Sequence, residues 1–283
     1  MSFRNFSFFF LLIFFVPGSL FALNNSFSFI TLRPSLTPSP QLSVAPSRTL
    51  KKHHLFMSST LDYSYKPLVA TSVAGIKTDV VPQAAVMHLG GGYGLTDRVS
   101  LGLEVPVVLL EQFHQLGQPD TDSKIGFGDI RLEVPWQIYE SRFVPEWGIG
   151  LRPFLLVPTG YGRFYMSSDQ VVSGGAVLAM DRRFQKITLT GNLGGQVNRE
   201  SRLGDLPYDD QFLVAGAASY SLDKKWTLFL EGEGRTLFDD FFQSQKSSAV
   251  EIRGGSHFAV SREWDLFAAA GHGFLKGIGT PLF

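Results

Sequence analysis

The stretch WTLFLEGEGRTLF, from Trp226 to Phe238, decides the fold because its two faces differ in chemistry. Trp226, Leu228 and Leu230 are apolar and share the even-numbered positions of the stretch. Glu231, Glu233 and Arg235 are charged and share the odd-numbered positions. Successive side chains of a β-strand point to opposite faces. The pattern therefore predicts a strand with one oily face and one ionic face.

The same period of two returns along most of the chain. Apolar and polar residues alternate over roughly ten positions within residues 99–109, 129–138, 147–155, 187–198 and 250–260. Short polar turns at 96–98, 140–142, 181–183, 223–225 and 261–263 alternate with longer connections rich in Gly, Asp, Gln and Ser. Tight turns at one rim and long loops at the other are typical of an up-and-down antiparallel barrel. We count about eleven strands, the first near residues 55–65.

Two environments produce such alternation, a soluble sandwich and a membrane barrel. Strands of about ten residues match the span of tilted barrel strands rather than the shorter strands of soluble sheets. Aromatic residues lie near strand ends beside the short turns, as in an interfacial girdle: Trp136, Trp147, Tyr220, Trp226 and Trp264. The sequence therefore predicts an all-β transmembrane barrel in a bacterial outer membrane, with lipid and lipopolysaccharide as its surroundings.

Charges of both signs recur in the middle of the predicted strands. In lipid a basic side chain at the midplane costs about 2–4 kcal/mol, whereas in a lumen acids and bases can pair across strands or keep water. We therefore predict that ten residues line the lumen: Glu104, Asp129, Arg131, Glu133, Arg152, Glu231, Glu233, Arg235, Glu251 and Arg253.

The N-terminal part has a different composition. Residues 1–22 combine Arg4, an apolar run and a small-residue cleavage site, which predicts a signal peptide. Residues 23–54 are rich in Ser and Pro without a period, which predicts a flexible leader. The barrel is expected over residues 55–283. Single-chain barrels have an even number of strands, so we expect about twelve, with the last strand missing after residues 277–281. Either the chain is truncated there, or the strand count is off by one.

Five stretches resemble known outer-membrane families: YGLTDRVSLGLEVPV (93–107), IGFGDIRLEVPW (125–136), RPFLLVPTG (152–160), RLGDLPYDDQFLVAGAASYSL (202–222) and GIGTP (277–281). They are similar to the N-terminal barrel of OmpA-like proteins and to an outer-membrane channel family associated with the MetA pathway of aromatic degradation. The resemblance covers roughly residues 55–281. It implies a porin-like barrel without catalytic residues, followed in some members by a peptidoglycan-binding domain.

The chemistry-bearing residues favour transport over catalysis. The net charge of zero does not point to nucleic acid, and the absence of cysteine excludes thiolate metal sites and a Cys nucleophile. Acids near residues 120–122 and 205–210 read as solvated loop residues rather than metal ligands, and His88, His257 and His272 lack a defined Ser partner. We therefore expect no enzyme, no cofactor and no metal. The first hypothesis is a channel or transporter for small solutes. The alternative is a structural barrel that anchors the envelope or a missing peptidoglycan-binding domain, with cell-wall contact only if that domain exists.

Overall fold

The computed structural model describes residues 32–71, 77–114, 121–141, 146–160, 171–203, 206–243, 247–261 and 263–276. These residues form fifteen strands and one short 3₁₀ helix. In chain order the elements are β1 (Leu55–Thr71), β2 (Lys77–Gly94), β3 (Ser100–His114), β4 (Thr121–Phe127), β5 (Ile130–Glu133), β6 (Trp136–Glu140), β7 (Glu146–Val157), β8 (Ser173–Arg183), β9 (Ile187–Val197), β10 (Ser201–Leu203), β11 (Leu206–Tyr208), β12 (Gln211–Ser221), β13 (Trp226–Leu237), η1 (Phe238–Asp240), β14 (Ser248–Ala259) and β15 (Asp265–Lys276). Within the ranges just given, no helix is long and apolar enough to cross a membrane.

One antiparallel sheet contains almost all of these strands. Its order is β1-β2-β3-β5-β7-β8-β9-β12-β13-β14-β15, with β4 also paired to β3 and β6 also paired to β7. Neighbours in the sheet follow one another along the chain, so the predicted all-β, up-and-down antiparallel fold is confirmed. The separate hairpin β10-β11 lies in what the sequence predicted to be a long loop.

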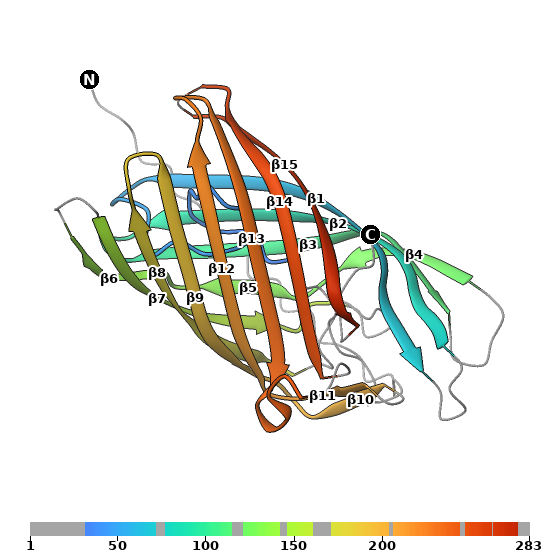
Figure 1. Ribbon diagram of the computed structural model, residues 1–283. Helices are drawn as coiled ribbons and strands as arrows, with labels where there is room; N and C mark the ends of the chain where they lie inside the picture. Colours follow the sequence, from blue (N-terminus) through green and yellow to red (C-terminus); the bar gives the residue numbers. More distant parts are fainter. Residues whose placement is uncertain are drawn as a thin grey trace, which may run out of the picture.

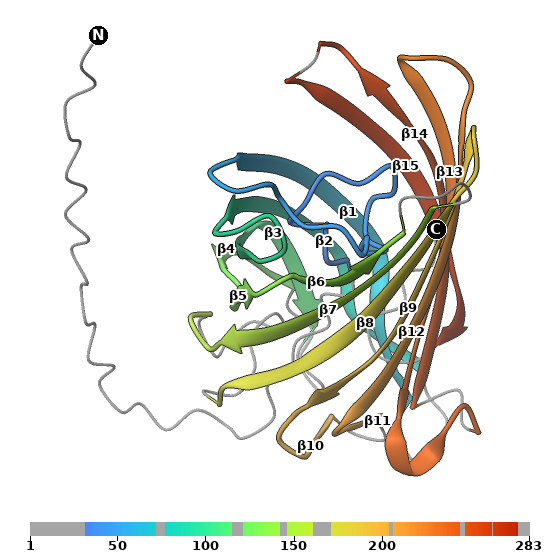
Figure 2. The same ribbon diagram turned by 90° about the vertical axis from the view of Figure 1, so that its left-hand side faces the viewer.

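The sheet curls into an open half-barrel. Figure 1 shows β1, β2 and β3 behind β12 to β15, and the view in Figure 2 shows the curl. In the described part of the chain β1 and β15 each pair on one side only. Among these residues the path across the sheet has eleven strands, which matches the eleven counted in the sequence, and a twelfth strand that would close the cylinder is not present among them.

Three short strands, β4, β5 and β6, together occupy the place of one strand between β3 and β7. β4 pairs with β3, β5 pairs with β3 and β7, and β6 pairs with β7. They are separated by Gly128-Asp129 and by Val134-Pro135. Pro135 has no N–H to donate to a ladder, but its carbonyl accepts a hydrogen bond of 3.0 Å from the N–H of Ser100. The sheet therefore stays hydrogen-bonded from β3 to β7 despite the breaks between these short strands.

The two faces of the sheet separate oily from ionic side chains, as β13 illustrates. Leu228 and Leu230 are 46% and 58% exposed, whereas Glu231 is 2% exposed. Leucine or isoleucine is likewise exposed on strands around the whole curl, at Leu61, Leu103, Leu132, Leu155, Leu189, Ile252 and Leu266. The outer surface is therefore apolar and the concave side is polar.

Three of the short turns share one pattern of hydrogen bonds. A side-chain oxygen of the first turn residue accepts the N–H groups two and three residues later, at Thr96, Asp223 and Ser261. The N–H groups of Lys225 and Trp226 thereby hold the pKa of Asp223 below its usual range. The turn predicted at 181–183 lies slightly later in the chain, because β8 continues through Arg183.

Residues 32–50 run through the concave side of the sheet without regular secondary structure, as the dark-blue chain in Figure 2. Leu36 and Val44 are 0% and 1% exposed, and Gln41 and Ser47 are also buried. The sequence predicted a flexible leader here, and the described residues show a packed segment instead. We call residues 32–50 the inner segment.

Glycines in the sheet make room for the inner segment. A Cβ added at Gly92 would lie 2.5 Å from the carbonyl oxygen of Leu36, and one added at Gly150 would lie 2.5 Å from that of Ser47. Glycine within a strand often marks a close approach of another backbone. The wall is therefore shaped to admit the main chain of the inner segment.

The glycine at position 150 provides a test of this packing. We expect Gly150→Ala to destabilise the docked inner segment by about 1–3 kcal/mol, because the new methyl group meets main chain rather than a movable side-chain tip. Hydrogen exchange of residues 42–48, measured by mass spectrometry on protein refolded in detergent, should become faster. Gly191→Ala is the matched control, since a Cβ at Gly191 meets nothing within 4 Å. Equal protection in both variants would contradict the close approach.

Candidate functional site

The strands bring the predicted charged residues together on the concave side. Of the ten predicted lumen residues, nine are buried and Glu233 is half-buried. Nine of the ten fall into two ionic clusters, described below, and the tenth, Asp129, lies between β4 and β5, where the N–H of Gly160 donates to it at 3.3 Å. Their place on the inner wall is thus observed, whereas their contact with a solute stays a prediction.

The first cluster spans β2, β3, β5 and β7. His88 Nδ1 and Glu104 Oε1 are 2.7 Å apart, and Arg131 Nε lies 2.7 Å from the other oxygen of Glu104. Arg131 also approaches Glu133 at 3.5 Å, and Arg152 Nε donates to Glu133 at 2.5 Å. Acids and bases therefore alternate along this wall, which lowers the cost of removing each charge from water.

The second cluster lies on β13 and β14. Glu231 faces Arg253 across the two strands, and Glu233 faces Glu251. Arg253 binds both oxygens of Glu251, at 2.7 and 2.6 Å, and its Nη1 lies 3.4 Å from Glu231 and 3.5 Å from Glu233. Arg235 binds Glu233 at 2.8 and 2.5 Å. Arg253 thus sits among three carboxylates and offsets the repulsion between the two facing acids.

Glu231 also holds the main chain of the inner segment. Its Oε2 accepts the N–H groups of Leu42, Ser43 and Val44 at 3.2, 3.1 and 3.5 Å, and its Oε1 accepts the Ser43 hydroxyl at 2.8 Å. Three successive N–H groups around one carboxylate form an anion-binding turn. A segment without a ladder of its own has its donors satisfied in this way.

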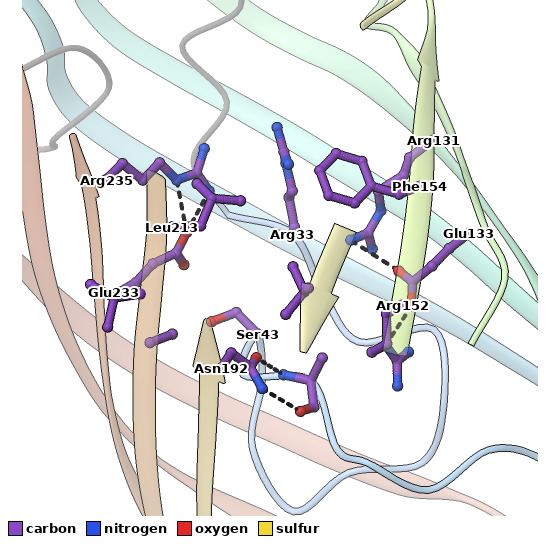
Figure 3. Close-up of a pocket in the computed structure, with 14 residues that line it drawn as sticks. Arg33, Ser43, Arg131, Glu133, Arg152, Phe154, Asn192, Leu213, Glu233 and Arg235 are labelled. Atoms are coloured by element: carbon purple, nitrogen blue, oxygen red, sulfur yellow. Dashed lines mark hydrogen bonds and ion pairs between the residues drawn. The ribbon is translucent and has the colours of Figure 1, made fainter. Parts of the chain in front are cut away.

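Two further wall residues hold the next part of the inner segment. The N–H of Ala45 donates to Oδ1 of Asn192 at 2.8 Å, and Nδ2 of Asn192 donates back to the Ala45 carbonyl at 2.8 Å. Figure 3 shows this pair of bonds. The N–H and hydroxyl of Ser47 both donate to Oδ2 of Asp181, at 3.0 and 2.5 Å. Side chains of β8 and β9 thus recognise the segment through its backbone.

The arginines of the first cluster satisfy carbonyl groups of the same segment. Arg152 Nη1 donates to the carbonyl of Pro46 at 2.8 Å, and Arg131 Nη2 donates to that of Pro34 at 2.6 Å. Proline brings no N–H of its own, so at these positions only the carbonyl needs a partner, and an arginine N–H donates to it. The irregular Pro-rich segment predicted to be flexible is ordered because the wall supplies a partner for its main chain.

Several wall residues were not among the sequence candidates. Asp181 was assigned to a turn, Asn192 and Gln196 were placed on a polar face without a role, and His88 was considered only as a hydrolase histidine. All four are buried. The signal available in the sequence was their place in the alternation, which turns all four toward the concave side on β2, β8 and β9. This can be read only once the strand boundaries are known.

The other chemical candidates do not assemble into a site. Within the described ranges no group of three or more His, Asp or Glu is placed to hold a metal ion. His257 lies 3.2 Å from Asp265 and stacks on Phe267, so its partners are structural. Asp120 and Asp205 lie outside the described residues, whereas Asp122 lies in β4 rather than in a loop and Oδ1 of Asp210 accepts the N–H of Asn198 at 2.8 Å.

The carboxylate of Glu231 offers a test of how the inner segment is held. Glu231→Gln keeps the side-chain size but replaces an acceptor of three N–H groups by an amide, at a cost of about 1.5–3 kcal/mol. We expect faster hydrogen exchange at residues 42–44 and a lower urea midpoint. Glu263→Gln, at an exposed turn, should leave both unchanged. Unchanged exchange in Glu231→Gln would mean that the segment is held elsewhere.

Comparison with protein-family models supports a family assignment. No curated protein matches the chain. The model of the family described as "Putative MetA-pathway of phenol degradation" matches residues 79–276, which is more than half of the chain and runs from within β2 to the end of β15. This chain, with its ionic inner wall, belongs to the family described as the putative MetA-pathway of phenol degradation.

Proposed function

We propose that this protein is an outer-membrane transport component, a β-barrel that passes small solutes and is closed at rest by its inner segment. One observation carries the proposal: a curved antiparallel sheet exposes leucine and tryptophan outward and buries paired charges inward. A soluble sheet protein has the reverse arrangement, with its apolar face inside. The family match supports a transport role, and the resemblance to OmpA-like barrels adds the expectation of an envelope location.

Lipid is the surrounding that suits the outer surface. The exposed leucines recur on strands around the whole curl, and Trp136, Trp147 and Trp226 lie at strand ends close to half-exposed. An apolar band flanked by aromatic residues is typical of outer-membrane barrels. Contact with lipid and lipopolysaccharide is therefore part of the proposal, and cell-wall contact belongs to it only if a further domain exists.

The membrane part of the proposal can be tested at one outward position. Leu230 is 58% exposed in the middle of β13, so Leu230→Arg should be nearly neutral in water but should cost about 2–4 kcal/mol at a bilayer midplane. Urea titration of protein folded into lipid vesicles measures this. Leu222→Arg, in the turn before β13, is the control and should cost at most about 1 kcal/mol. Equal midpoints for both variants would argue against lipid around β13.

The inner segment controls passage in this proposal. It occupies the concave side and is held largely by hydrogen bonds between wall side chains and its main chain. Water can replace such bonds one by one, so displacement needs no change in the sheet. A solute path therefore opens when the inner segment leaves the wall.

A disulfide lock tests this step, because the chain contains no cysteine that would interfere. A Cβ at Gly148 would lie 3.2 Å from the Cβ of Ser47, close to the disulfide range of about 3.5–4.5 Å. In the double variant Ser47→Cys, Gly148→Cys we expect low planar-bilayer conductance when oxidised. Reduction should raise it, because the unbonded side chains then crowd the segment. Ser47→Cys alone should not respond to reductant.

The same assay decides between transport and the second candidate. The second candidate is a structural barrel. The observation that favours it is that the inner segment and the ion pairs fill the concave side. If the reduced double variant carries no current, the structural role replaces the transport role. If the oxidised and reduced forms conduct equally, the barrel conducts but the inner segment does not control it.

A further inference from the structure

A cavity remains between the inner segment and the wall, with an excess of positive charge around it. Its volume is about 80 Å³, and the residues around it come from the inner segment and from β5, β7, β8, β9, β12 and β13. Four arginines but only two glutamates line it, namely Arg33, Arg131, Arg152 and Arg235 with Glu133 and Glu233. The lining therefore carries two more positive than negative groups.

Three of these arginines already have a carboxylate. Arg152 binds Glu133 at 2.5 Å and Arg235 binds Glu233 at 2.5 Å. Arg131 binds Glu104, which lies behind the cavity wall, at 2.7 Å. Arg33, from the inner segment, has no ion pair with any residue in the described ranges. Its Nη2 donates at 2.8 Å to the neutral amide oxygen of Gln196.

The surroundings of Arg33 define what it can bind. Figure 3 shows Arg33 between the Glu233–Arg235 pair and the ring of Phe154. Its Cζ lies 5.2 Å from the centre of that ring, a cation–π contact that supplies no negative charge. A guanidinium has five N–H donors, so the bond to Gln196 leaves capacity for a bidentate acceptor. Arg33 is half-buried and lines the cavity.

Part of the remaining lining is apolar, and the volume of the cavity sets the size of a ligand. Phe154, Val177 and Leu213 form this part of the wall. A water molecule needs roughly 10–15 Å³ of such space, so a cavity of about 80 Å³ holds on the order of five or six heavy atoms. A carboxylate group with a short hydrocarbon tail matches both the charge and the volume.

We propose that this cavity binds a small organic monocarboxylate, with the carboxylate on Arg33 and the tail against Phe154, Val177 and Leu213. This rests on the proposed function, because it names the class of solute that the barrel takes up. A bound carboxylate supplies the charge that Arg33 lacks and leaves the three existing ion pairs intact. A neutral phenol of similar size would fill the apolar wall but would leave Arg33 unpaired.

Titration calorimetry on the full-length protein in detergent tests the site with butyrate as the probe. We expect saturable butyrate binding and no binding of butyramide, its neutral analogue, or of phenol. Arg33→Gln should weaken butyrate binding at least tenfold. Arg98→Gln, which removes an arginine from an exposed turn, should leave it unchanged. Equal butyrate affinity in Arg33→Gln, or equal binding of butyramide, would overturn the proposal.

Smaller anions distinguish a carboxylate site with an apolar wall from a site for any anion. Acetate and chloride should bind more weakly than butyrate, and Phe154→Leu should narrow the difference between butyrate and acetate. If chloride competes as well as butyrate, the site binds any small anion and the carboxylate assignment falls. Calorimetry does not depend on conduction, so binding without bilayer current would remove the transport role and keep the site. Bilayer current without butyrate binding would keep the transport role and remove the carboxylate site.

Discussion

Charge buried on the concave side is the constraint on which the rest of the structure depends. Strand geometry forces alternate side chains to opposite faces, so an apolar outer surface places every other residue inside. On β13 and β14 this brings three acids and two bases together, and Arg253 alone cannot satisfy Glu231, Glu233 and Glu251. The unused oxygen of Glu231 accepts main-chain N–H groups of the inner segment. The wall and the segment therefore complete each other.

This mutual dependence sets an order of assembly. The partners of the inner segment lie far away in sequence, with Val44 bonded to Glu231, Ala45 to Asn192 and Ser47 to Asp181. Those side chains lie on β13, β9 and β8, of which β8 and β9 pair directly and β13 joins them through β12. Contacts of such long separation form after the local hairpins, because closing a long loop costs entropy before the contact repays it. The sheet can thus form first and receive the inner segment afterwards.

The alternation of apolar and polar residues with a period of two accounts for most of what could be predicted from the sequence. It is a local property, so it located the strands, the oily face and the inward position of Glu231, Arg253 and the other charged residues. It failed for residues 32–50, because nothing local in a Pro-rich stretch indicates that Glu231, Asn192 and Asp181 will supply its partners. Gly92 and Gly150 held the missing information, since inward glycines leave space for another backbone, but their inward position is known only from the register. The anion site was equally hidden, because Arg33 and Phe154 meet only in three dimensions.

The location of Arg33 on the inner segment links ligand binding to passage. The apolar part of the cavity belongs to the fixed strands, whereas Arg33, which has no ion pair within the described part of the chain, belongs to the segment that must move. A ligand that contacts both parts binds the docked state more tightly than the displaced state. It therefore stabilises the docked state by the difference between its binding free energies for the two states. Displacement separates Arg33 from Phe154 and so divides the site, which lowers the affinity as the path opens. One movement would then both open the barrel and release a carboxylate held at its wall.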